Sequence, residues 1–111
     1  MSNMAESVWG VYEIRSKSSY AGPGMRGYDA EARVEDQYGN AVYVHVNEYE
    51  NRHYTVSKTS IYDYMTGKSD EDPNAVYDEE YEKLSDAKVS KFYKVFDTLN
   101  KVITRMEKGL V

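Results

Sequence analysis

The stretch that decides the fold is ARVEDQYGNAVYVHV, residues 32–46. On both sides of DQYGN, apolar and polar side chains alternate, which is typical of two half-buried antiparallel strands. Asp36 suits the start of a type I turn, and Gly39 offers the positive φ that a three-residue hairpin loop requires. These residues therefore predict a β-hairpin with its loop over residues 37–39.

The register of this hairpin follows from its loop. With that loop, every cross-strand pair on the even-numbered face is apolar: Val34 with Val42, Ala32 with Val44, and Ala30 with Val46. A slip of one residue would mix polar and apolar side chains on both faces. We therefore expect the even-numbered face to be core and the odd-numbered face to be the outer surface.

Four strands are expected in all, near residues 7–16, 28–36, 41–49 and 53–58. Between the first two lies SKSSYAGPGMRG, whose Gly and Ser content favours a mobile loop. The turn EYENR joins the last two strands. A pairing that keeps apolar residues on the core face sets Val44 opposite Tyr54 and, on the other face, His45 opposite His53.

The C-terminal segment carries the clearest helical pattern. Its apolar residues are spaced three and four apart, which predicts an amphipathic helix over about residues 85–108: Val89, Phe92, Phe96, Leu99, Ile103, Met106 and Leu110. Two further helices are predicted from their caps. One is a short helix between Ser60 and Gly67, with a strand extension as the alternative. The other runs from Asp72 and Pro73 through Leu84, with a break near Ser85.

These elements define an α+β fold in a single domain over residues 1–111. An antiparallel sheet of about four strands is expected to be covered on its even-numbered face by the C-terminal helix. The apolar stripe of that helix has an alternative use as the seam of a homodimer, because Lys94, Lys101 and Lys108 recur every seven residues.

Composition narrows the class of protein. The chain has 12 Tyr but no Cys, which is easiest to reconcile with a reducing compartment. It has neither a leader pattern nor about 18 consecutive apolar residues, so a cytoplasmic protein without membrane contact is expected. In being small, acidic, Cys-free and Tyr-rich, the chain is similar to phage or mobile-element inhibitors such as anti-CRISPR proteins, and to toxin-immunity proteins. That resemblance implies an inhibitor-like binding protein.

Charge is distributed unevenly within a net charge of −5. Residues 69–86 carry eight acidic side chains and one basic one, whereas residues 87–111 carry six basic and two acidic. An acidic surface attracts basic partners and repels nucleic acid itself. We therefore expect a non-enzymatic protein that masks the basic, nucleic-acid-binding surface of a partner protein and needs no cofactor. The expected partner-binding residues are Asp70, Glu71, Asp72, Tyr77, Asp78, Glu79, Glu80, Tyr81 and Glu82, with Tyr43 and Tyr49 on the outer sheet face.

A metal site is the alternative hypothesis. In the predicted registers, Glu31, His45 and His53 form one row across three strands of the outer face. Two imidazoles and a carboxylate are ligands of zinc or of a non-haem metal, so the row would make a small metal-dependent enzyme or ligand-binding domain. The competing interpretation is that these are solvated polar residues on the open face of an antiparallel sheet.

Overall fold

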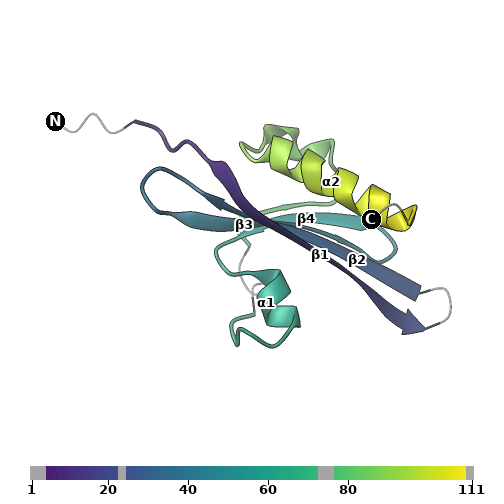
Figure 1. The fold of residues 1–111 in the computed structure, drawn as a ribbon. Helices are drawn as coiled ribbons and strands as arrows, with labels where there is room; N and C mark the ends of the chain where they lie inside the picture. Colours follow the sequence, from purple (N-terminus) through teal and green to yellow (C-terminus); the bar gives the residue numbers. More distant parts are fainter. Residues whose placement is uncertain (1–4, 23–24, 73–76, 110–111) are drawn as a thin grey trace.

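In the computed structural model, which describes residues 5–22, 25–72 and 77–109, five antiparallel strands follow one another in chain order across a single sheet (Figure 1). The strands are β1 (Gly10–Gly22), β2 (Met25–Glu35), β3 (Ala41–Glu48), β4 (Arg52–Ser57) and β5 (Glu79–Tyr81). The helix α2 (Tyr93–Glu107) lies across one face, and the short helix α1 (Ile61–Met65) lies against the other. The predicted α+β class is confirmed, with one strand more than the predicted four.

The central hairpin has the predicted register. Val34 pairs with Val42 and Ala32 with Val44, and Gly39 has a φ of 84°. The Asp36 carboxylate accepts hydrogen bonds from the backbone N–H of Tyr38 at 3.0 Å and of Asn40 at 2.8 Å. This side chain therefore closes the loop that sets the pairing of β2 with β3.

The core lies between the even-numbered face of the sheet and α2. Beneath the helix, the even-numbered side chains of β2 and β3 from Ala30 to Val46 are buried. From the helix side, Phe96, Leu99 and Ile103 are fully buried against them. The edge of the Phe96 ring meets the rings of Tyr54 and Tyr81, each at 5.9 Å between centroids. The centre of the apolar stripe is thus packed within the chain.

The C-terminal helix is shorter than predicted. Residues Asp86–Val89 form a single 3-10 turn, labelled η2, and Ser90 is extended, so α2 begins only at Tyr93. Val89, the first member of the predicted stripe, is 84% exposed. Because residues 77–84 are not helical, no break between two long helices lies near Ser85; the extended Ser90 separates η2 from α2, and Phe92 after it is buried in the core.

Two other segments differ from the prediction. The Gly- and Ser-rich stretch after residue 16 is not a loop over its whole length, because β1 and β2 pair outward as far as Gly22 and Met25. A two-stranded ribbon needs only backbone hydrogen bonds, which Ser and Gly do not prevent. The short helix at Ile61 is confirmed. The Ser60 hydroxyl accepts from the Asp63 N–H at 3.0 Å, and Gly67 follows with a φ of 78°.

The helix predicted through Leu84 is wrong for residues 77–84, and its expected start at residues 73–76 lies outside the described residues. Glu79–Tyr81 instead form β5, with Tyr54 opposite Tyr81 and Val56 opposite Glu79. Alternation explains this outcome, since Tyr81 packs on Phe96 while Glu80 points to the other face. Among the residues that the structure describes, no helix is long and apolar enough to cross a membrane.

Candidate functional site

The outer, odd-numbered face of the sheet is covered at its centre, so it is not the open face that the sequence predicts. Helix α1 packs over β2, and His45 and Thr55 are 1% and 2% exposed. Beneath α1 the two carboxylates of β2 flank the imidazole of β3. His45 Nδ1 lies 2.9 Å from a Glu31 oxygen, and His45 Nε2 lies 2.8 Å from an Asp29 oxygen.

This geometry sets the charge of His45. A ring nitrogen that faces a carboxylate must donate, so an imidazole between two carboxylates binds a proton on each nitrogen. Burial lowers the pKa of His45, but the hydrogen bonds and negative charges of Asp29 and Glu31 outweigh it and raise the pKa. Burial likewise raises the pKa of both carboxyls, but the hydrogen bonds and positive charge of His45, together with further hydrogen bonds to each carboxylate, outweigh it and lower the pKa of both. The three residues form a buried ionic triad.

Further polar groups surround the triad and tie α1 to the sheet. Asn47 donates to Asp29 at 2.8 Å, and the Tyr62 N–H donates to Glu31 at 3.1 Å. Arg15 of β1 bridges the two layers, because it donates to Glu31 at 3.1 Å and to Asp63 of α1 at 2.6 Å. Its guanidinium also lies 4.6 Å from the centre of the Tyr62 ring.

The hydroxyl of Ser60 belongs to the same network. Ser60 donates to Glu31 and accepts from Arg15 at 2.9 Å and from the Asp63 N–H at 3.0 Å. A hydroxyl has one donor and two acceptor positions, so the hydroxyl of Ser60 is fully used. Its role is to cap α1 and hold Glu31, which is a structural role.

The predicted row of Glu31, His45 and His53 is only partly formed. Glu31 faces His45 as expected, but His45 pairs with Thr55, and His53 pairs with Asn47. The turn between β3 and β4 takes three residues, with Glu48 facing Arg52 across it, which shifts every pair by two residues from the predicted register.

His53 therefore points to a different neighbour. Its Nε2 lies 2.8 Å from a Glu80 oxygen of β5, while both nitrogens of His45 are occupied by carboxylates. Within residues 5–22, 25–72 and 77–109, no group of three or more His, Cys, Asp or Glu side chains is arranged to hold a metal ion.

The predicted partner-binding acids form the second notable feature. We call the carboxylates of residues 70–72, 78–80 and 82 the acidic surface. All of them are exposed except Glu79, which is partly buried and accepts from the Tyr81 hydroxyl at 2.7 Å. Burial raises the pKa of Tyr77, and the negative charges of Glu80 and Asp72, one from each half of the surface, raise it further.

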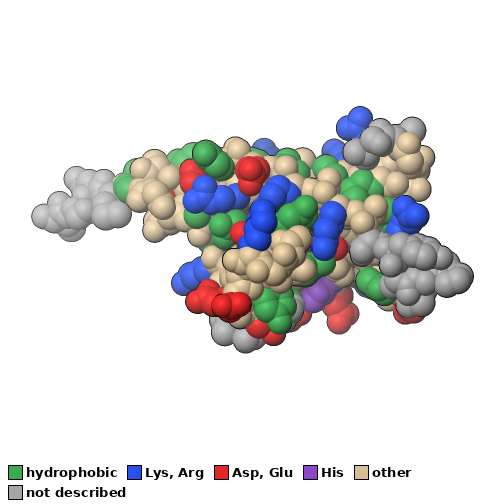
Figure 2. Space-filling model, turned by 60° about the horizontal axis from the view of Figure 1, so that its bottom comes forward, with side chains coloured by type: hydrophobic (Ala, Val, Ile, Leu, Met, Phe, Trp, Pro, Cys, Tyr) green, Lys and Arg blue, Asp and Glu red, His purple; other side chains and the backbone are tan. Residues whose placement is uncertain are grey.

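The acidic surface lies at the opposite edge of the sheet from the basic residues of β1. On the odd-numbered face, Arg15 and Lys17 of β1 lie opposite Glu31 and Asp29 of β2. Figure 2 shows a row of Lys and Arg side chains across this face, with Asp and Glu side chains toward its lower edge beside a histidine. The carboxylates of β5 therefore lie at the sheet edge farthest from Arg15 and Lys17.

The predicted tyrosines do not all belong to that edge. Tyr81 lies in β5 and Tyr77 lies just before it in the chain, and both are half-buried. Tyr49 lies in the turn between β3 and β4 and is 50% exposed. Tyr43 lies on β3, separated from β5 by β4, and faces Arg33 and Ser57.

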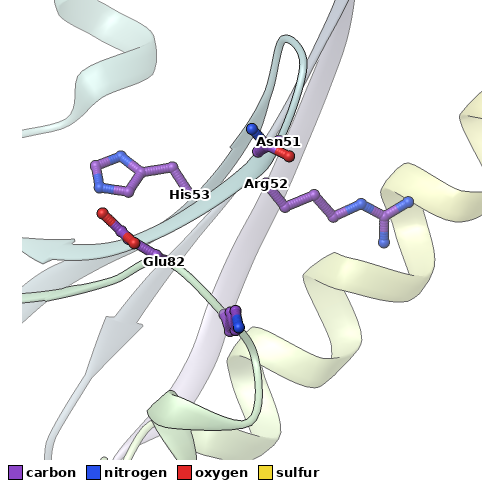
Figure 3. Close-up of a pocket in the computed structure, with 5 residues that line it drawn as sticks. Asn51, Arg52, His53 and Glu82 are labelled. Carbon is purple, nitrogen blue, oxygen red and sulfur yellow. The ribbon is translucent and has the colours of Figure 1, made fainter.

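A broad hollow of about 570 Å³ flanks the acidic surface at the turn between β3 and β4, and it is lined by Asn51, Arg52, His53, Glu82 and Lys83. In Figure 3 the His53 ring and the Glu82 carboxylate lie near each other, whereas Arg52 points away toward α2. Arg52 bonds there to Asn100 at 2.7 Å and to Glu107. The side chains that face the hollow are therefore mixed in charge.

Comparison of the chain with protein-family models, with curated proteins and with solved structures finds no match.

Proposed function

We propose that the chain is a non-enzymatic binding protein whose acidic surface masks a basic surface on a partner protein. The observation that supports this proposal is the exposure of six carboxylates around β5, in a segment with Lys83 as its single basic residue. Some of these carboxylates also have partners within the chain. Glu80 pairs with His53 and Glu71 accepts from Thr59 at 3.1 Å.

The short, charged edge strand β5 favours a partner that binds through charge. β5 is only three residues long, and short charged edge strands resist the addition of a further strand. A partner would therefore bind the carboxylates rather than add a strand to the sheet. Such a field accelerates association with basic surfaces and is screened beyond about 8 Å at physiological ionic strength.

The negative charge of the acidic surface indicates which kind of partner it binds. Proteins that bind nucleic acid present grooves of Lys and Arg to phosphates, and a row of carboxylates competes for the same groove. The proposed role is thus inhibitor-like, of the kind found in anti-CRISPR or immunity proteins. The polar triad under α1 supports a binding rather than a catalytic role, because its hydrogen-bonding groups are used in holding the fold.

The test is affinity capture from a bacterial lysate at low salt, with elution at high salt. Three baits are compared: the unchanged chain, a double variant in the acidic surface (Asp78→Lys with Glu82→Lys), and a matched double variant elsewhere (Glu6→Lys with Glu13→Lys). All four positions are exposed and both variants change the net charge equally. Only the variant in the acidic surface should lose the salt-eluted partner, by about tenfold or more. Equal retention by both variants, or a partner that salt does not release, would contradict the proposal.

A further inference from the structure

A smaller hollow, of about 200 Å³, lies on the odd-numbered face between α1 and Tyr77. His45 and Asn47 of β3, with His53 and Thr55 of β4, line it from the sheet. Ile61, Tyr64 and Met65 line it from α1. The hollow therefore joins an apolar and aromatic wall to a polar base.

The base of the hollow holds a buried hydroxyl that makes no hydrogen bond within the described part of the chain. Thr55 is 2% exposed, and its Oγ1 has no hydrogen-bond partner among the described residues. A buried hydroxyl without a partner destabilises a fold, so buried polar groups are nearly always satisfied. An unsatisfied hydroxyl in the lining of a hollow points to a ligand group that bonds to it.

The charged groups around the hollow favour a cationic ligand. Asn47 uses one N–H of its amide on Asp29, which leaves its carbonyl oxygen and its second N–H for a ligand. Glu80 lies beside the hollow, bonded to His53. Burial raises the pKa of Tyr77, and the negative charges of Glu80 and Asp72 raise it further. His45 is positively charged, but the two carboxylates that flank it outweigh its charge.

We infer that this hollow holds one basic side chain, from an arginine or a lysine of the partner protein. Its aliphatic stem would lie along Ile61 and Met65, as the stems of such side chains commonly lie on apolar surface. Its cationic head would lie against the aromatic rings and donate to Thr55 Oγ1. The inference rests on the proposed function, since it names the anchor by which a basic partner is held at the acidic surface.

The test uses small probes, so that it does not depend on the identity of the partner. Isotope-labelled protein is titrated with N-acetyl-L-argininamide and, separately, with N-acetyl-L-citrullinamide, which has nearly the same shape but no charge. The charged probe should shift the amide resonances of Asn47, Thr55 and Tyr64 and bind about tenfold more tightly than the neutral one. Equal binding of both probes, or shifts confined to residues outside the hollow, would overturn the inference.

Two variants control for the site. Thr55→Val keeps the shape and removes the hydroxyl, and Tyr64→Leu removes a ring that is 37% exposed, so both should fold. Each variant should lower the affinity for the arginine probe several-fold, and unchanged affinity in both variants would contradict the inference. If the probe fails while the acidic surface still captures its partner in a salt-dependent way, only the anchor is wrong. If the probe binds through Thr55 while capture fails, the proposed function is wrong and the binding site remains.

Discussion

Replacing His45 by Leu should destabilise the protein more than any change on its surface. The substitution keeps a side chain of similar size but removes both donors from Asp29 and Glu31, which are 2% and 1% exposed. Removing one partner of a buried ion pair costs about 3–5 kcal/mol, because the remaining charge has no compensation. A domain of this size is stable by about 5–15 kcal/mol in total. We therefore expect the variant to lose between a fifth and the whole of its stability.

The assay is urea unfolding followed by far-UV circular dichroism, at a series of pH values. The pKa of His45 is raised above its ordinary 6.5, so its contribution is complete below pH 6.5 and is lost as the pH rises through the folded-state value. The pKa values of Asp29 and Glu31 are lowered from 3.8 and 4.5, so their contribution is complete above those values and is lost as the pH falls through the folded-state ones.

The contribution of the triad to the stability of the unchanged protein should therefore be largest between about pH 4.5 and 6.5. Above pH 6.5 its stability should fall by up to about 1.4 kcal/mol per pH unit, which is the slope for release of one proton. The Leu variant should lack that fall. A loss of under about 1 kcal/mol on substitution, or a variant whose stability falls with pH as steeply as that of the unchanged protein, would refute a charged His45.

Three further changes test the fold. Thr55→Val should raise stability by about 1 kcal/mol in thermal unfolding, because it removes an unsatisfied buried hydroxyl, and a loss would show that the hydroxyl is bonded. Phe96→Ala should cost about 3–5 kcal/mol, since the ring is fully buried between Tyr54 and Tyr81, and a cost near that of a surface change would place the core elsewhere. Gly39→Ala should cost about 1 kcal/mol in urea unfolding through its φ of 84° alone, because nothing lies within 4 Å of the added Cβ, and a neutral effect would contradict the hairpin loop.

The central hairpin could be predicted because two independent signals agree. The apolar alternation excludes a slip of one residue, and Gly39 selects the length of the loop. The turn between β3 and β4 lacks a glycine, so only the alternation was available. A shift of two residues leaves every side chain on the same face, and the pattern of apolar residues could not distinguish Val44 opposite Tyr54 from the observed Val56.

The burial of the polar face could not be predicted from the sequence, for a different reason. The pairing of Glu31 with His45 was predicted correctly, but polar residues on a strand normally indicate solvent, and nothing local shows that α1 covers them. Alternation places Asp29 and Thr55 on this face, whereas Arg15 and Ser60 were missed because they come from β1 and from the turn before α1. The one usable signal was a carboxylate at both 29 and 31, on the same face as the single histidine of β3.

The strand β5 was missed because its sequence favours another element. Three residues carry little alternation, and the acidic run after Pro73 has the composition of a helix N-terminus. Pairing with β4 and the packing of Tyr81 on Phe96 decide the outcome, and both are tertiary contacts. The exposure of the acids was predictable even so, since charged side chains remain at the surface in either form.

The central claim is that the acidic surface takes the place of nucleic acid on its partner. The most direct measurement is competition. The protein eluted from the unchanged bait by salt is bound to a fluorescent nucleic acid, and the chain is added while anisotropy is followed. The proposal predicts that the nucleic acid is displaced at a one-to-one ratio, and that Asp78→Lys with Glu82→Lys abolishes displacement while Glu6→Lys with Glu13→Lys does not. A ternary complex, in which the chain binds and the nucleic acid stays bound, would contradict it.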